Sequence, residues 1–114
     1  MRSYPEHAIQ VAICHYLDLM KVPFFAIPNG GKRPDRTGKR LVQEGMKSGV
    51  ADLFLMIPNK IFHGLFIEVK TPVGRQQPSQ KDFEKIAFNS GYCYEVVKSL
   101  DDLINCLETY KKIR

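Results

Sequence analysis

The sequence lacks the features by which several common protein classes are recognised. Its three cysteines, Cys14, Cys93 and Cys106, form no CxxC pair, so we expect buried thiols and neither a disulfide framework nor a zinc site. No apolar stretch approaches the roughly 20 residues that a membrane-spanning helix requires. Polar residues interrupt the N-terminal segment, which therefore has no signal-peptide pattern. We expect a protein that is not secreted and does not enter a membrane.

The sequence also lacks the arrangements on which several catalytic chemistries depend. His7, His15 and His63 are scattered along the chain, which is not the spacing of a zinc site. The segment Gly30-Gly31-Lys32-Arg33 does not have the spacing of an NTPase phosphate-binding loop. No serine or cysteine stands in a pattern typical of a nucleophile. We therefore look to the charged residues for the chemistry of this chain.

What the sequence has is an excess of positive charge on a chain of ordinary globular composition. Its 114 residues are 44% hydrophobic, and no repeat or linker divides them, so we expect a single domain over residues 1–114. Lysine and arginine number 17 against 12 acidic residues, which gives a net charge of +5. This balance favours a polyanionic partner.

Hydrophobic periodicity and turn signals predict an α/β fold. The expected helices cover residues 3–21 and 79–89 and begin again after Ser99, and the expected strands cover residues 24–27, 52–57, 64–70 and 92–97. The second and third strands should form an antiparallel hairpin, and the helix at 79–89, with Ser79 as its N-cap, implies a right-handed crossover to a parallel strand. We expect a mixed sheet of about four strands, in the order αβββαβα, with helices on both faces.

The strand at residues 64–70 carries two charges in an otherwise apolar sequence. Glu68 and Lys70 should share one face of this strand, because side chains alternate along it. A hairpin turn centred near Lys60 places Asp52 opposite Glu68, unless the register slips by a residue or two. Two carboxylates and a lysine would then converge at one point. The alternative is that each is an ordinary surface charge at the end of a strand.

Two further polar side chains fall on the inner faces of predicted helices. Glu6 lies about two turns before Ile13 and so shares its buried stripe, either as a helix-capping carboxylate or as a ligand aimed inward. Gln80 lies one turn before Phe83 and joins the face that covers the sheet. Both residues could therefore approach the converging carboxylates.

Carboxylates grouped in this way suit Mg²⁺ or Mn²⁺, which accept oxygen ligands and a substrate phosphate. Asp52 and Glu68 would hold the ion, Glu6 could be a third ligand, and the backbone carbonyl of Val69 a further one. Lys70 could orient a water molecule or stabilise charge that develops on phosphorus. The pattern therefore indicates phosphate chemistry.

A long connection at residues 28–49 is rich in glycine and basic residues. Connections of this length inside compact domains are usually functional, and a brief helix at 41–46 is expected within it. We interpret it as a phosphate-contacting flap, the alternative being a solvated loop. The basic residues expected to contact a nucleic acid are Lys32, Arg33, Arg36, Lys39, Arg40 and Lys47, with Arg75 in the loop that follows the central strand.

Taken together, the chain resembles the VRR-NUC (virus-type replication-repair nuclease) family of the PD-(D/E)XK superfamily, and in particular its short phage-type stand-alone members. The Asp followed by Glu-x-Lys on the adjacent strand is the superfamily signature, and Ala51 replaces the usual proline before the Asp. The residues that carry the resemblance are Glu6, segment 28–31, Gly45, segment 49–52, segment 66–70 and Ser79-Gln80.

The resemblance implies a restriction-endonuclease-like fold and an Mg²⁺- or Mn²⁺-dependent phosphodiesterase that acts on DNA. Asp52, Glu68, Lys70 and Gln80 would be catalytic, with Glu6, Asp52, Glu68 and Val69 at the metal. Such members suit branched or flapped DNA, work as homodimers, and would act in the cytoplasm of a bacterium or a phage-infected cell. The remaining alternatives are an end-processing exonuclease, a restriction-type enzyme, a non-catalytic DNA-binding module and a generic basic interaction domain.

Overall fold

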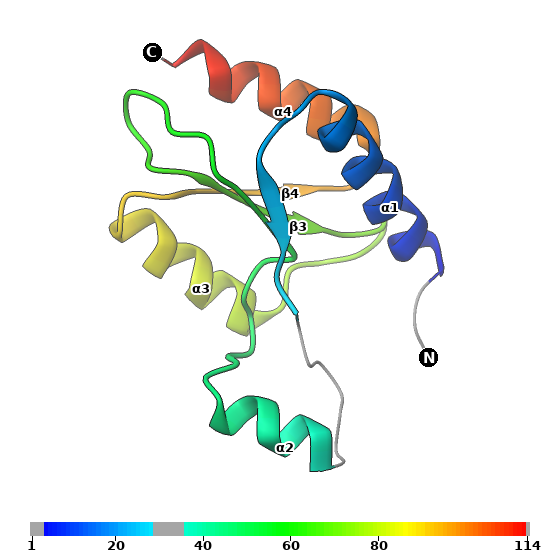
Figure 1. Ribbon diagram of the computed structural model, residues 1–114, viewed down its shortest axis with the longest axis vertical. Coiled ribbons are helices and arrows are strands. Elements are labelled where there is room, and N and C mark those ends of the chain that lie inside the picture. The colour runs from blue at the N-terminus through cyan, green and yellow to red at the C-terminus, as the bar shows by residue number, and fades with distance from the viewer. Residues whose placement is uncertain (1–3, 29–35, 114) are drawn as a thin grey trace.

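The computed structural model describes residues 4–28 and 36–113 (Figure 1). Along the chain its elements are α1 (Tyr4–Leu19), β1 (Phe24–Ala26), α2 (Arg36–Gln43), β2 (Leu53–Leu55), β3 (Leu65–Val69), α3 (Pro78–Asn89), β4 (Cys93–Val97) and α4 (Leu100–Lys112). The predicted α/β fold is confirmed, with α2 inserted between the first two strands. No helix in the described ranges is long and apolar enough to cross a membrane.

The four strands form one mixed sheet in the order β1-β2-β3-β4. β1 and β3 both pair antiparallel with β2, whereas β3 and β4 are parallel, as the crossover through α3 requires. Leu53 pairs with Ile67 and Leu55 with Leu65, so the paired residues are centred on Lys60. Beyond the last pair, the Asp52 amide donates to the Ile67 carbonyl and the Asp52 side chain accepts from the Val69 amide. The predicted register is therefore confirmed for the paired residues of the two strands.

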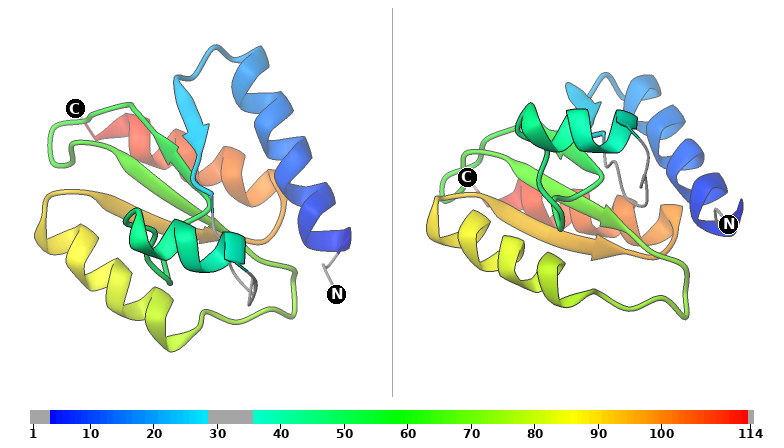
Figure 2. Two further views of the ribbon diagram at one scale, coloured as in Figure 1. Left: turned by 60° about the horizontal axis from the view of Figure 1, so that its bottom comes forward. Right: turned by 90° about the horizontal axis from the view of Figure 1, so that it is seen from below.

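Helices cover both faces of this sheet (Figures 1 and 2). On one face α1 and α4 pack over the odd-numbered side chains of β3, which are fully buried. The core on this face consists mainly of Ile13, Leu17, Leu53, Leu55, Leu65, Ile67, Val69, Val97, Leu103 and Leu107. Because aliphatic side chains fill this face, it excludes water from behind the central strand.

On the other face α3 covers a cluster of aromatic rings. Phe66 on β3 lies 4.6 Å from the ring centre of Phe54 and 5.0 Å from that of Phe83 on α3. Tyr94 on β4 extends the same cluster, 6.0 Å from Phe83. The even-numbered side chains of β3 therefore point toward α3, and Glu68 follows Phe66 on this face.

Two details of the helices differ from the sequence-based expectation. α2 spans Arg36–Gln43, about one turn before the predicted helix at 41–46. α3 begins at Pro78 with Gln77 as its N-cap, so Ser79 lies inside the helix. Proline suits the first position of a helix, since it has no N–H to leave unpaired, and the cap therefore lies two residues upstream of the predicted one. Ser99 does cap α4, because its Oγ accepts from the Asp102 amide at 3.0 Å.

Candidate active site

Asp52 lies where the β2–β3 hairpin ends and is held by three backbone contacts. Its amide donates to the Ile67 carbonyl at 3.0 Å, and its carbonyl accepts from the Ile27 amide at 2.8 Å. Its Oδ2 accepts from the amide of Val69 at 2.7 Å. The carboxylate thus continues the hydrogen-bond ladder after the strand itself has stopped. This places it beside the last residues of β3.

Glu68 is the most deeply buried charged side chain among the described residues, with 3% of its surface exposed. Its Oε2 accepts from the Gln80 amide nitrogen at 2.8 Å and lies 3.5 Å from the Lys70 ammonium. Its Oε1 is buried without a hydrogen-bond partner among the described residues. A buried acceptor that lacks a partner costs about 1–3 kcal/mol. The site therefore has an oxygen oriented to receive a ligand.

Burial and charge together shift the protonation of this carboxyl group. Burial is the largest cause that raises the pKa of Glu68, to about 8, and the neighbouring Asp52 carboxylate raises it further. Lys70 lowers the pKa, but by less than these two effects raise it. Burial and the neighbouring carboxylate both favour the protonated form of Glu68, and a bound cation would oppose them. The pair is thus suited to exchange a proton for a cation.

Gln80 connects the start of α3 to the buried carboxylate. Its Oε1 accepts from the Gln77 amide at 2.7 Å, so its nitrogen is directed toward Glu68. Only 7% of its surface is exposed. Gly49, with a φ of +85°, packs against the same turn, where a Cβ would collide with the Ser79 carbonyl. The loop before Asp52 and the helix that carries Gln80 are therefore in direct contact.

Lys70 and Val69 complete the carboxyl end of β3. The Lys70 side chain is 12% exposed, and its backbone amide is fixed by the Val97 carbonyl at 2.9 Å. Backbone groups alternate along a strand, so the Val69 carbonyl points toward β2, as the Ile67 carbonyl does. There it lies past the last paired residue of β2 and on the same side as Asp52. Both residues are thus adjacent to the two carboxylates.

The donor set at this point fits a hard divalent cation. Asp52 and Glu68 supply carboxylate oxygens, and the buried Oε1 lacks any other partner among the described residues. Glu6 is half-buried in the first turn of α1. However, the described residues contain no group of three or more His, Cys, Asp or Glu side chains spaced to hold a metal. The structure thus brings two of the three predicted carboxylates together, and Glu6 as a third ligand stays a prediction.

The predicted nucleic-acid contacts are distributed over two segments. Lys39 and Arg40 are exposed on α2, which stands apart from the layered body in Figure 1, and Lys47 is exposed just after it. Arg40 lies 3.8 Å from Glu44 in an exposed i,i+4 pair. Arg75 is exposed in the loop between β3 and α3. Lys32 and Arg33 lie outside the described residues, as does the side chain of Arg36.

Two basic residues that the sequence reasoning missed lie near the same end of the sheet. Lys81 on α3 and Lys98 after β4 line a pocket together with Arg75. A signal for Lys98 was present, because it follows β4 as Lys70 follows β3, and parallel strands end at the same edge of a sheet. No periodic pattern identifies Lys81, which is one of two exposed lysines on its helix.

One known protein family matches most of this chain. The family model that describes the VRR-NUC domain matches residues 6–101, which is most of the chain and includes Asp52, Glu68, Lys70 and Gln80. The chain belongs to the VRR-NUC family. Membership of this nuclease family implies DNA as the substrate. A search of curated protein sequences found no match.

Two solved structures share the VRR-NUC fold of this chain. One, described as a VRR_NUC domain protein, has a TM-score of 0.81 and 23% identity, over 99% of this chain and 93% of its own. Another, described as a VRR_NUC domain, has a TM-score of 0.67 and 18% identity, over 95% of this chain and 99% of its own. At these identities the likeness establishes the fold alone.

Proposed function

We propose that this VRR-NUC chain is a metal-dependent DNA endonuclease that hydrolyses phosphodiester bonds and selects branched or flapped DNA. The observation that carries the proposal is the buried carboxyl group of Glu68, which neighbours Asp52 and Lys70 and whose Oε1 has no hydrogen-bond partner among the described residues. A buried carboxylate oxygen that receives no hydrogen bond costs free energy, and a bound cation would offset that cost. Because the pair is acidic within a basic protein, a purely DNA-binding role does not account for it.

In this proposal Asp52 and Glu68 hold Mg²⁺ or Mn²⁺, with the Val69 carbonyl and Glu6 as further ligands. The ion, when bound, polarises the scissile phosphate and lowers the pKa of a coordinated water. Lys70 stabilises the charge that develops on phosphorus as the bond to water forms and the bond to the leaving oxygen breaks. Gln80 holds Glu68 in place through the 2.8 Å hydrogen bond, which leaves Oε1 directed at the site.

The preference for DNA structure over base sequence follows from what the described surface offers. Its contacts are basic side chains on α2 and in the 71–77 loop, which suit phosphates and do not read base edges. Backbone and shape recognition therefore fit this chain best.

The catalytic proposal is tested with linear duplex, flap and four-way-junction DNA, in Mg²⁺ or in EDTA. Asp52→Asn suits the test, because asparagine keeps an oxygen for the Val69 amide but removes a metal-binding charge. Lys70→Met retains length without charge. We expect wild type to cut branched DNA only with metal, and both variants to lose about 100-fold or more in rate.

Lys60 supplies the matched control, because it is an exposed lysine in the hairpin turn at the other end of β3. Lys60→Met should cut as wild type does, and thermal melting should confirm that every variant is folded. Wild type that cuts nothing in metal, or an Asp52→Asn variant that cuts normally, would refute the catalytic role. Cutting only from strand ends would indicate an exonuclease.

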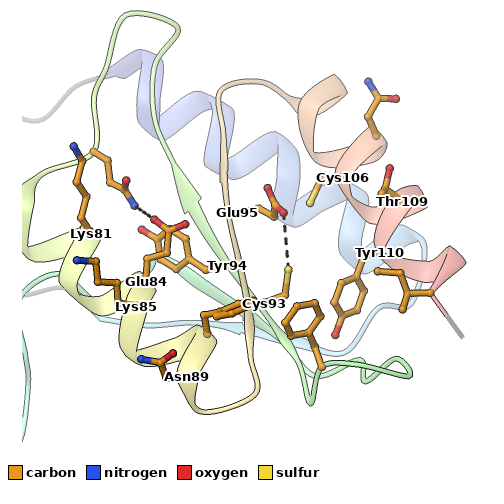
Figure 3. Close-up of a pocket in the computed structure, with 15 residues that line it drawn as sticks. Lys81, Glu84, Lys85, Asn89, Cys93, Tyr94, Glu95, Cys106, Thr109 and Tyr110 are labelled. Carbon is orange, nitrogen blue, oxygen red and sulfur yellow. Dashed lines mark hydrogen bonds between the residues drawn. The ribbon is translucent and has the colours of Figure 1, made fainter.

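We infer that the active form is a homodimer that associates through the outer edge of β4. The Cys93 amide and Val97 carbonyl bond to β3, so alternation directs the backbone groups of Tyr94 and Val96 outward. A groove of about 1040 Å³ follows this edge between α3 and α4 (Figure 3). Phe88, 63% exposed, lines it. Its walls carry both lysines and glutamates, so two copies are complementary in charge.

Sedimentation or light scattering tests this association. Phe88→Asp should shift the protein toward monomer, because it places a charge in the groove. Ile86→Asp is the control, since Ile86 is equally exposed at 63% on the same helix but does not line the groove. A wild type that is monomeric throughout the micromolar range, or equal effects of both substitutions, would refute the interface.

A further inference from the structure

A second pocket lies beyond the carboxyl ends of β3 and β4. It has a volume of about 690 Å³ and is formed by the loop after β3, the first turns of α3 and the end of β4. The charged side chains that line it are Arg75, Lys81 and Lys98, and no described acidic residue does so. We call this pocket the basic pocket. None of the three forms an ion pair with a carboxylate in the described part of the chain. Such a cluster favours an anionic ligand.

The basic pocket adjoins the catalytic strand directly. Val96, on its wall, is the register partner of Glu68, and neighbouring strands lie about 4.8 Å apart. Gly74, also on the wall, is so close to Lys70 that a Cβ on the glycine would lie 3.4 Å from the Lys70 Cβ. The pocket therefore begins one strand away from the proposed scissile phosphate.

Backbone contacts position the cations of this pocket. The amide of Lys98 donates to Asp102 Oδ2 at 3.0 Å, at the start of α4, and its ammonium reaches the Pro72 carbonyl at 3.4 Å. That single neutral acceptor leaves most of the ammonium's donor capacity available. Lys81 directly follows Gln80, whose amide is fixed by Glu68 and Gln77. Both lysines therefore stand on backbone that is held in register with the active site.

We propose that the basic pocket binds a phosphate of the substrate strand that flanks the cleaved bond. The inference rests on the nuclease function proposed above and adds Lys81 and Lys98 as substrate-positioning residues. Successive nucleotides of one DNA strand rise about 3.4 Å. A site about 4.8 Å from the catalytic strand thus takes a phosphate within the first few nucleotides of the cut. The phosphate is either an internal diester or a strand-terminal phosphate.

The double substitution Lys81→Ala/Lys98→Ala tests the pocket with the whole chain and a branched substrate that wild type cuts. We expect KM and Kd to rise about tenfold or more while kcat changes less than about twofold, because neither lysine touches the cleaved bond. The dependence of binding on salt should also weaken, by about 0.9 in the logarithmic slope for each phosphate that the variant no longer neutralises. Lys112→Ala, an exposed lysine in the last turn of α4, should change none of these values.

Methylphosphonate substitution identifies the phosphate. A methylphosphonate at the contacted phosphate should weaken the binding of DNA by wild type about tenfold. The same change should hardly weaken the binding of DNA by the double variant, which has already lost the contact. If the sensitive position is internal, the ligand is a backbone diester; if removal of a terminal phosphate has the same effect, it is a strand end. Equal sensitivity of wild type and double variant at every position would refute the pocket.

The test separates this inference from the catalytic proposal. If wild type neither binds nor cuts DNA in the presence of metal, the nuclease function itself fails. If wild type cuts and the double variant behaves like Lys112→Ala, only the role of the basic pocket fails.

Discussion

Gln80 donates its amide hydrogen to the buried Oε2 of Glu68 while its own oxygen accepts from the Gln77 backbone. Because the nitrogen donates one bond and the oxygen accepts the other, the orientation of the amide is fixed. The start of α3 is thereby coupled to the carboxylate at the end of β3. Helix capping and the orientation of the Glu68 carboxyl group depend on the same side chain.

Gln80→Ala should therefore affect both stability and activity. Removing the amide leaves a buried charged acceptor with one partner fewer, at a cost of about 1–3 kcal/mol in the free energy of unfolding. We expect kcat to fall while the affinity for DNA, measured in EDTA, stays within about twofold. Urea unfolding and single-turnover cleavage measure the two effects. Asn89→Ala, at the exposed end of the same helix, is the control, and equal behaviour of the two variants would contradict the coupling.

The raised pKa of Glu68 predicts how stability depends on pH in the absence of metal. A carboxyl group whose pKa rises from 4.5 to about 8 on folding binds its proton more tightly in the folded state. Its contribution to stability is full below pH 4.5 and is lost as pH rises to about 8, by up to about 1.4 kcal/mol per pH unit. Thermal melting in EDTA should show this decline, and Glu68→Gln should remove it.

Mg²⁺ should oppose the decline if it binds the deprotonated carboxylates, as proposed, and does so only in the folded protein. The gain in melting temperature on adding Mg²⁺ should thus increase from pH 5 to pH 8 in wild type. In Glu68→Gln the gain in melting temperature should be small and should not change between pH 5 and pH 8. An equal gain in both proteins would place the ion elsewhere.

Two glycines offer a matched test of the contact between the 46–51 loop and α3. Gly45 and Gly49 both have positive φ, so alanine at either costs about 1–3 kcal/mol in backbone strain. Only at Gly49 would the new Cβ also collide with the Ser79 carbonyl, whereas nothing lies within 4 Å at Gly45. Gly49→Ala should therefore lower the urea midpoint further and weaken Mg²⁺ binding at the nearby Asp52. Equal losses would argue against the contact.

The exposed cations of α2 should contribute to DNA affinity without affecting stability. Lys39→Ala/Arg40→Ala removes two charges, and the exposed Arg40–Glu44 pair contributes at most about 1 kcal/mol to stability. We expect weaker DNA binding and a logarithmic salt slope lower by up to about two. Filter binding across a salt series measures it, with Lys60→Ala as the control. An unchanged slope would remove α2 from the DNA-binding surface.

The sequence predicted the central part of this site because the relevant contacts are local. The pairing of β2 with β3 is symmetric about Lys60, so counting residues from the middle of the connection placed Asp52 near the end of β3. Gln80 was placed by helix phase alone, since Phe83 one turn later marks the inner face. Alternation along β3 and the periodicity of α3 are properties of single elements and can be read from one sequence.

The remaining features depend on contacts between distant segments. The position of α2 was wrong by about a turn, because its polar residues give no apolar stripe that marks its limits. Lys81, Lys98 and Arg75 come from three segments, and only the packing of β4 beside β3 brings them together. Likewise, the free Oε1 of Glu68 is a property of the folded interior. Sequence patterns indicate which residues face inward but not which of their atoms lack a partner.

The hydrogen bond from the Val69 amide to Asp52 makes one backbone proton a spectroscopic reporter of the active site. A cation bound to Asp52 withdraws electron density from the oxygen that accepts this bond, so the amide resonance of Val69 would move with metal occupancy. The Ile67 amide, two residues earlier on the same edge, serves as an internal reference. Metal titration could thus be followed by NMR in the native chain, without a substrate and without an added probe.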